Sequence, residues 1–304
     1  MGLKMPKAYS EKLKRDIKVD EAVKKNIREG LFCSNEKCRI PLTLVDTFKR
    51  NSRLVSAHFR RREKKEHIEE CDYNTLGQIN IVARESEGAL ASINDKKYRL
   101  RLNLISTDIK NNRLSKQKET TALNINSVKQ PTKNYSSIEG GSAYLSTIKK
   151  IMQIKSKIED HYELRNLIEI QFNDKNIRWS DFYFENDKYE NCFKKICTNK
   201  IDYPICIEGE IKSFERPNET FSFYSIKLKL QLLGKDKNDT NRYVAVSILL
   251  SNDLLFENLN KEFESGKRYV AFCTSMRAKS VKSLKSEFLN LTGVIYNKKQ
   301  IHIY

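Results

Sequence analysis

FCSNEKCRI at residues 32–40 and HFRRREKKEHIEEC at residues 58–71 decide how the first part of this chain folds, because they concentrate its metal-ligand side chains. Three of the seven cysteines and two of the four histidines of the 304-residue sequence lie in these two stretches. The odd number and uneven spread of the cysteines do not suit a disulfide framework, and in a reducing compartment such clusters more often bind metal. The two stretches therefore predict a metal site.

The ligand spacing indicates a zinc site with four protein ligands. Cys33 and Cys38 can meet across a tight turn, and His67 and Cys71 lie one helical turn apart on the same face. Three thiolates and one imidazole form a complete tetrahedral set for Zn²⁺, and a filled set leaves no position for a reactive water. We therefore expect these four residues to hold a structural Zn²⁺ ion.

His58, between the two ligand pairs, is a fifth candidate whose role the sequence leaves open. It could replace His67 as a ligand, support the ligands from outside the coordination sphere, or stack with Phe59 beneath the site. The alternative without a metal, in which buried cysteines and exposed histidines are unrelated, does not explain why so many of them lie this close together.

The text FCSNEKC…HFRRREKKEHIEECDY resembles the N-terminal zinc-binding segment of competence CoiA-like proteins and related bacterial zinc-finger modules. In these proteins a Cys pair is followed by a His-Phe dipeptide and then by a His or Cys pair, and the likeness covers about forty residues of this chain. The resemblance implies the same four ligands, with His58-Phe59 as the matching dipeptide, and it implies contact with DNA. It does not imply nuclease activity, because CoiA-like proteins carry that in a separate domain whose motif is not found here.

The charge of the chain favours a polyanionic partner. Lys and Arg number 57 against 39 Asp and Glu, a formal net charge of +18, and the basic excess is concentrated in the first half. We expect nucleic acid as the partner, DNA in preference to RNA, although a solvated lysine-rich surface would give the same composition. The candidate phosphate contacts in this half are Arg60, Arg61, Arg62, Lys96, Lys97, Arg99 and Arg101.

Hydrophobic periodicity and turn residues predict an α+β chain. Residues 10–29 and 142–161 have apolar faces at helical spacing, whereas residues 77–85 and 96–106 read as strands. Residues 107–137 are polar and without periodicity, which indicates a flexible linker. The predicted regions are a zinc-binding module with an N-terminal helix (1–75), basic strands and a flexible linker (76–140), an α+β segment (141–200) and an OB-like barrel (201–304).

The last region has the element order strand–strand–strand–helix–strand–strand, which is that of an OB-fold barrel, although other small barrels and α+β sheets share it. OB-folds bind single-stranded nucleic acid through aromatic side chains that stack on bases and basic ones that follow phosphates. In FSFYSIKLKL, residues 221–230, alternation sends Ile226, Leu228 and Leu230 to one face and Phe223 with Lys227 and Lys229 to the other. The candidate contacts in this region are Phe223, Lys227, Lys229, Arg242, Arg268, Arg277 and Lys279.

Two other classes of function are weighed against this one. Glu210 and Lys212 form an E-x-K pattern of the kind found in metal-dependent nucleases. Such a site also needs an upstream acid, for which the candidates are Asp181, Asp187 and Asp202. Alternatively, the barrel could dock a protein partner while the basic stretch serves solubility. We favour a non-enzymatic protein that binds single-stranded DNA or processed ends, in genome maintenance or phage defence.

The sequence shows no membrane segment. No stretch is apolar and long enough to cross a bilayer as a helix, and the N-terminal residues lack the apolar core of a signal peptide. We expect a cytoplasmic protein without a membrane partner.

Overall fold

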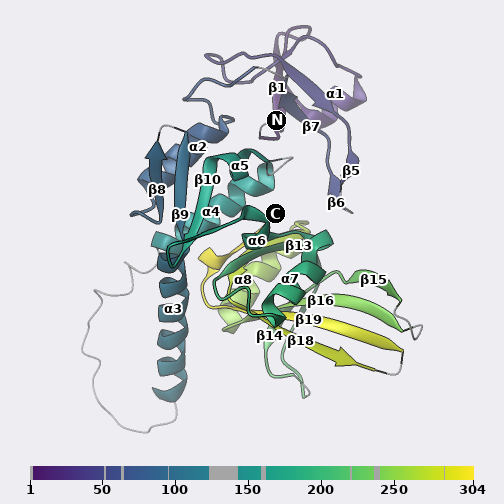
Figure 1. Ribbon diagram of the computed structural model, residues 1–304. Helices are drawn as coiled ribbons and strands as arrows, with labels where there is room; N and C mark the ends of the chain where they lie inside the picture. The colour runs from purple at the N-terminus through teal and green to yellow at the C-terminus, as the bar shows by residue number, and fades with distance from the viewer. Residues whose placement is uncertain are drawn as a thin grey trace.

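The structure, a computed structural model, describes residues 3–50, 53–62, 65–94, 96–122, 143–158, 162–219, 221–235, 240–283 and 285–304. Three regions follow one another along the chain (Figure 1): an N-terminal module of short strands, a central sheet with helices, and a large C-terminal sheet. The chain is a mixed α+β protein, as the sequence predicts. None of the described helices is long and apolar enough to cross a membrane.

The N-terminal module is built almost entirely from short strands. Its three-stranded sheet has the order β2-β1-β3, and β4 pairs with β7 while β5 pairs with β6. The elements are β1 (Lys7–Ser10), β2 (Arg15–Lys18), α1 (Val19–Lys24), β3 (Leu31–Phe32), β4 (Leu42–Val45), β5 (Phe48–Arg50), β6 (Arg53–Val55) and β7 (His58–Arg61).

The helix expected over residues 10–29 is wrong, because strands β1 and β2 form a hairpin there and α1 is only a short helix. Lys14 has a left-handed φ of 53° and turns the chain between the two strands. Ala8 and Ile17 are cross-strand partners and both are buried, so a period of two places them in the core.

Two separate hydrophobic cores hold the molecule together. The smaller one lies in the N-terminal module, where the backbones of Met5 and Phe59 hydrogen-bond in both directions, at 2.9 and 3.0 Å. The larger one draws almost all of its side chains from between Ile79 and Ile303 and joins the central and C-terminal regions. Tyr73 packs against both cores. The N-terminal module is therefore a packing unit of its own.

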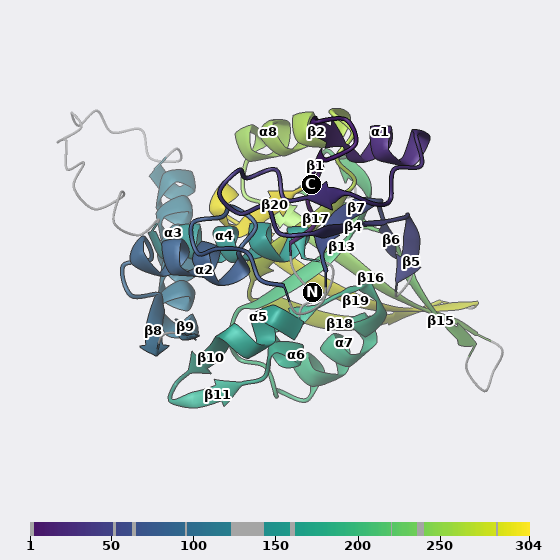
Figure 2. The same ribbon diagram turned by 90° about the horizontal axis from the view of Figure 1, so that it is seen from above.

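The central region is a four-stranded sheet of order β11-β10-β9-β8. Helices α2, α3 and α5 contact its strands, and α4 packs against α2 and α3 (Figure 2). The elements are α2 (Thr75–Arg84), β8 (Leu90–Asn94), β9 (Lys97–Arg101), α3 (Leu102–Ala122), α4 (Ala143–Lys157), α5 (Tyr162–Leu167), β10 (Ile168–Phe172) and β11 (Lys175–Ile177). The helix expected at residues 142–161 is confirmed as α4.

The strand expected at residues 77–85 is wrong, because these residues belong to helix α2 and its C-terminal cap. Ile79 and Val82 are buried three positions apart, as on one side of a helix, whereas Ile81 is exposed. The spacing of Ile79 and Ile81 resembles that of a strand, but only Ile79 is buried.

The linker expected at residues 107–137 is corrected in its first part, which continues helix α3 as far as Ala122. Leu102, Ile105 and Ile109 are buried at helical spacing and fix the first turns of α3 in the larger core. The polar sequence that follows them gave no sign of this anchoring. The remainder of the expected linker lies outside the described residues.

The C-terminal region is a nine-stranded sheet with the path β18-β19-β16-β14-β13-β17-β20, in which β12 pairs with β13 and β15 with β16. From β13 on, four strands precede helix α8 and four follow it, where three strands, a helix and two strands were expected, and β16 runs parallel to β19. The elements are α6 (Trp179–Phe182), β12 (Tyr183–Phe184), α7 (Tyr189–Cys197), β13 (Ile205–Glu215), β14 (Tyr224–Leu228), β15 (Gln231–Lys235), β16 (Asn241–Leu250), α8 (Asp253–Glu264), β17 (Tyr269–Thr274), β18 (Met276–Lys282), β19 (Ser286–Ile295) and β20 (Ile301–Ile303).

No closed barrel forms among the described residues, so the OB-like barrel is corrected to an open mixed sheet. β17 and β19 meet through side chains and not through a strand ladder: the Thr274 hydroxyl donates to the Val294 carbonyl at 2.8 Å. β18 and β19 instead continue as a hairpin beside β16 and β15, and these four strands extend to the right in Figures 1 and 2. We call the four strands β15, β16, β18 and β19 together the wing.

Helix α4 is fixed to the C-terminal sheet by a buried ion cluster. Lys155, only 2% exposed, contacts Glu185 at 2.9 Å and Glu208 at 3.4 Å. The Tyr183 hydroxyl donates to the Glu208 carboxylate at 2.6 Å, and the Tyr189 hydroxyl donates to the Glu208 carbonyl at 2.8 Å. Because a buried lysine is tolerated only when it is paired, this cluster ties the central and C-terminal regions together.

Candidate metal centre

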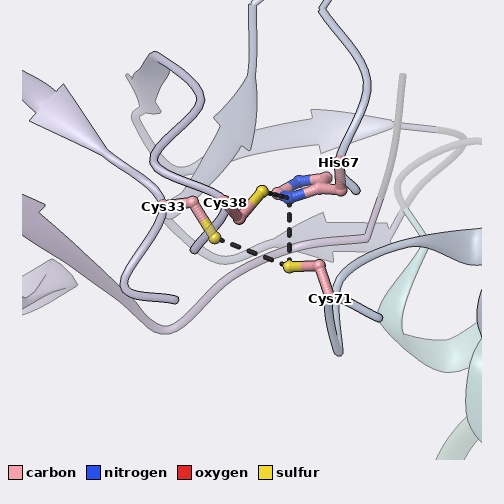
Figure 3. Close-up of side chains that lie close together, drawn as sticks. All are labelled: Cys33, Cys38, His67 and Cys71. Carbon is pink, nitrogen blue, oxygen red and sulfur yellow. Dashed lines mark hydrogen bonds between the residues drawn. The ribbon is translucent and has the colours of Figure 1, made fainter. Parts of the chain in front are cut away.

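The structure brings the four predicted ligands together (Figure 3). Cys33 follows strand β3 and Cys38 lies in the next turn, whereas His67 and Cys71 lie between β7 and α2. All four donor atoms lie within 4.8 Å of one another. The Cys33 and Cys71 sulfurs are 3.7 Å apart, and His67 Nδ1 lies 3.4 Å from the sulfur of Cys38 and 3.3 Å from that of Cys71.

These distances suit a tetrahedral metal. With Zn–S bonds of about 2.3 Å and Zn–N bonds of about 2.0 Å, the edges of a zinc tetrahedron are about 3.8 Å between sulfurs and about 3.5 Å from sulfur to nitrogen. The three distances given above, 3.3–3.7 Å, are close to those edges. The cluster could therefore hold a metal ion such as zinc.

The first ligand pair is shaped by a tight turn between Cys33 and Cys38. The Cys38 and Arg39 N–H groups both donate to the Asn35 carbonyl, at 3.0 and 3.1 Å, and Arg39 has a left-handed φ of 40°. The Arg39 guanidinium then donates to the Cys33 carbonyl at 3.1 Å and lies over the Tyr9 ring, 3.8 Å from its centroid. Arg39 therefore fixes the turn to strand β1.

The second ligand pair is tied to the start of helix α2 by Asn74. Its side-chain oxygen accepts the Gly77 N–H at 3.0 Å and so caps the helix, while its amide nitrogen donates to the carbonyls of His67 and Ile68, at 2.9 and 3.1 Å. The segment passes so close to α2 that a Cβ at Gly77 would lie 2.6 Å from the Glu69 carbonyl oxygen. The ligand geometry thus depends on the first turn of α2.

Burial sets the protonation of the ligands. It raises the pKa of the Cys33 thiol to about 12 and also raises the pKa of Cys71. Burial, together with the positive charge of Arg61, lowers the pKa of His67 to about 4. The imidazole is therefore neutral at pH 7, as a ligand must be, and a thiolate here requires a cation beside it.

His58, the fifth candidate, is not part of the four-residue group. It lies in strand β7, where it is buried and its Nδ1 is 2.8 Å from the Ser56 carbonyl. Its neighbour Phe59 is fully buried in the smaller core. The structure therefore brings His67, and not His58, to the other ligands.

The basic candidates of the first half lie in different surroundings. Arg61 and Lys96 line a pocket beside His67, together with Tyr73 and the first turn of α2. Lys97 and Arg99 on β9 both approach Glu169 of β10, at 3.6 and 3.7 Å, so their charges are partly balanced. The Arg62 side chain donates to the Leu42 carbonyl at 3.4 Å, Arg60 is half-buried, and Arg101 is exposed.

Four candidates of the C-terminal region already have partners, and the first of them, Lys227, lies 3.8 Å from the Glu215 carboxylate. Lys229 forms an ion pair with Glu210 at 2.5 Å, and Arg242 forms one with Glu287 at 2.8 Å. The Arg268 guanidinium donates to the Phe263 carbonyl at 2.8 Å. These contacts partly balance or engage the charges of these side chains, so the remaining candidates of this region are more available to a ligand.

The other candidates there are accessible. Phe223 is 51% exposed and packs edge-on against Phe221, whose ring lies 4.9 Å from the Lys227 ammonium group. Arg277 and Lys279 project from strand β18 and are exposed. The expected alternation holds only from Ile226 to Lys229, because Leu230 is exposed and Ser225, on the side of the lysines, is fully buried.

The nuclease candidates do not assemble into an acidic site. Glu210 pairs with Lys229, while Lys212 is exposed. Asp181 forms ion pairs with Lys195 and Arg178. Within the part of the chain that the structure describes, the Cys₃His cluster is the one group of three or more such side chains close enough to hold a metal.

Sequence reasoning missed two residues that build the site, Asn74 and Gly77. The signal for Asn74 was present, because an Asn before a ten-residue helix is a typical N-cap, but residues 77–85 were expected to be a strand. The close approach at Gly77 has no sequence signal beyond the glycine itself.

Comparison with known proteins adds no relative. No protein-family model matches this chain, and no curated protein sequence matches it. The likeness to the CoiA-like zinc segment therefore rests on the four ligand residues and the His58-Phe59 dipeptide. The chain is a mixed α+β protein with an N-terminal Cys₃His cluster that is consistent with a zinc module.

Proposed function

We propose that this protein binds nucleic acid, DNA in preference to RNA, and that a structural Zn²⁺ ion holds its N-terminal module together. The observation that carries the proposal is the Cys₃His set at tetrahedral distances, flanked by the basic strand β7. Four protein ligands fill a zinc coordination sphere, so the ion would have a structural role and no open position for catalysis.

The size of the module supports a structural role for the metal. Its separate core contains few side chains, and small units of this kind usually need a metal or disulfides for stability. The metal would cross-link the segment after β3 to the segment before α2, which lie on opposite sides of the β4–β7 strand pair in the sequence.

The charge distribution supports the nucleic-acid partner. The chain carries a formal net charge of +18, and Arg61 and Lys96 line the pocket beside the metal centre. Contact with DNA is what the likeness to CoiA-like segments implies.

The proposal is tested by metal analysis and by binding measurements on the purified full chain. We expect about one zinc per chain. Fluorescence anisotropy with single-stranded DNA, duplex DNA and RNA should show tightest binding to DNA, with an affinity that falls steeply as salt rises. Absence of zinc would refute the structural role. Weak, salt-independent binding to every nucleic acid would refute the partner and favour a protein-interaction role.

A further inference from the structure

An apolar row crosses one face of the wing. Strand register places Leu232, Tyr243, Phe288 and Val281 directly opposite one another on β15, β16, β19 and β18. Residues directly opposite one another project from the same face of a sheet. Leu232 is 63% and Val281 46% exposed, and the Tyr243 and Phe288 rings stack with centroids 5.4 Å apart and planes at 18°. With about 4.8 Å between strands, the row is about 14 Å long.

Basic and neutral polar side chains continue this face toward the centre of the sheet. Because side chains two positions apart along a strand project from the same face, two more rows belong to this face. The Lys227 ammonium donates to the Ser247 hydroxyl at 3.2 Å, which confirms that these two residues share it. The added rows are Ala245–Asn290–Lys279 and Lys227–Ser247–Thr292–Arg277. We call the three rows together the outer face. None of its residues carries a carboxylate.

The opposite face of the same strands is already occupied. Val244 and Leu289 are buried there, and helix α7 contacts β18 and β19. Arg242, also on that side, pairs with Glu287 at 2.8 Å and approaches Glu190 of α7 at 3.8 Å. The sheet therefore uses one face for packing and presents the outer face to solvent.

The charges of the outer face define the partner that it fits. Arg277 and Lys279 are exposed and, within the described residues, form no ion pair, so they offer uncompensated positive charge. A stacked, half-buried aromatic pair beside such cations suits a ligand with flat rings and regularly spaced anions. Asn290 and Thr292 between them can hydrogen-bond base edges.

We propose that the outer face binds single-stranded nucleic acid, with bases stacked on the Tyr243–Phe288 pair and phosphates held by the cations of this face. A duplex fits less well, because its bases are stacked on one another and not free to pack on protein rings. This inference rests on the proposed nucleic-acid-binding function and names the site at which single strands bind.

The test uses two matched sets of variants of the full chain. Replacing Tyr243 and Phe288 by Leu removes the stacking rings while keeping apolar volume, and Arg277→Gln with Lys279→Gln removes the two exposed cations. The control, Lys194→Gln with Lys200→Gln, removes two exposed charges from α7 and its C-terminal turn, on the occupied side. Binding is measured by anisotropy with labelled oligo(dT) of about 16 nucleotides, oligo(rU) of equal length and a duplex.

We expect the Leu pair to weaken oligo(dT) binding by about 10- to 100-fold, with a smaller loss on the duplex. The Arg277/Lys279 pair should also reduce the slope of log K against log salt by about 0.7 for each lost phosphate contact, and the control pair should not. Photo-cross-linking of bromouracil-substituted oligonucleotide should label Tyr243 or Phe288, a readout that does not depend on the stability of a variant.

The outcomes separate this inference from the proposed function. If the wild type binds nucleic acid but both variant pairs bind like it, and cross-links lie elsewhere, the outer face is not the site while the proposed function stands. If the wild type binds none of the three probes, both are overturned. A loss of oligo(dT) binding equal in the control pair and the Arg277/Lys279 pair would also overturn the inference, because it would show a general effect of charge.

Discussion

Asn74 performs two tasks with one side chain, and two substitutions separate them. Asn74→Ala removes the N-cap of α2, worth about 1 kcal/mol, and the two hydrogen bonds to the carbonyls of His67 and Ile68, worth about 0.5–1.5 kcal/mol each. The free energy of unfolding should therefore fall by about 2–4 kcal/mol. Asn74→Asp keeps the acceptor that caps the helix but replaces the amide donor with an acceptor facing two carbonyls. It should mainly loosen the ligand segment and weaken zinc binding by about 10- to 100-fold.

The assays are urea unfolding of the zinc-loaded chain, followed by circular dichroism, and zinc competition with a chromophoric chelator. Asn252→Ala is the matched control, because Asn252 caps α8 through the Leu255 N–H at 2.8 Å and lies far along the chain from the metal ligands. It should lower stability by about 1 kcal/mol and leave zinc affinity unchanged. Wild-type zinc affinity in Asn74→Asp would refute the idea that Asn74 holds the ligand segment.

Four further predictions address the metal, the basic residues, an exposed ring and pH. Cys38→Ser should unfold the N-terminal module and leave the rest of the chain folded, because the two hydrophobic cores are separate. Proton NMR should show this partial unfolding, and the control Cys197→Ser, at an exposed cysteine, should leave the spectrum unchanged. Lys96→Gln with Arg101→Gln should reduce the slope of log K against log salt for duplex binding by about 0.9 per lost contact. Lys97→Gln with Arg99→Gln should reduce this slope less, because Glu169 already balances those two charges. Equal effects of the two variants would contradict the ion-pair argument. Phe223→Ala should weaken single-strand binding about five- to a hundred-fold without changing the melting temperature, since the ring is half exposed; a large fall in melting temperature would assign the ring to the core. Burial raises the pKa of Asp108 from 3.8 to about 6, so the contribution of this carboxyl to stability is fully present below pH 4 and is lost as the pH rises through 6. Asp108→Asn should flatten this part of the curve of unfolding free energy against pH. An unchanged curve would contradict the raised pKa of Asp108.

The metal centre could be predicted from the sequence because its information is local. Two short ligand pairs, Cys33 with Cys38 and His67 with Cys71, each fix their own geometry, and tetrahedral chemistry then joins them. The residues that hold the pairs in place could not be predicted in the same way. Asn74 acts on a segment that precedes it, and Gly77 matters only because the Glu69 carbonyl passes close by.

The fold was predictable where burial follows a single period and was missed where two periods compete. The buried Ile226 and Leu228 alternate with half-exposed or exposed lysines as a strand on the surface of a core should. In the N-terminal hairpin, the apolar residues have a helical spacing, but the left-handed turn at Lys14 interrupts it. Lysine has no preference for this conformation, so its position could not be predicted from the residue type. The expected C-terminal order took β14 with β15, and β17 with β18, as single strands, and order alone does not determine whether the last strands close a barrel, because closure depends on long-range pairing.

The buried ion cluster at Lys155 has a consequence for how this sequence can change over generations. Because Lys155 and Glu208 are both almost fully buried, replacing Lys155 alone leaves the Glu208 carboxylate buried without the lysine ammonium group, at a cost of about 3–5 kcal/mol, whereas replacing one glutamate leaves Lys155 paired with the other. That cost is a large fraction of the roughly 5–15 kcal/mol by which an ordinary domain is stable. In homologous sequences we therefore expect Lys155 and Glu208 to be exchanged together, for example to an apolar pair, and Glu185 to vary more freely.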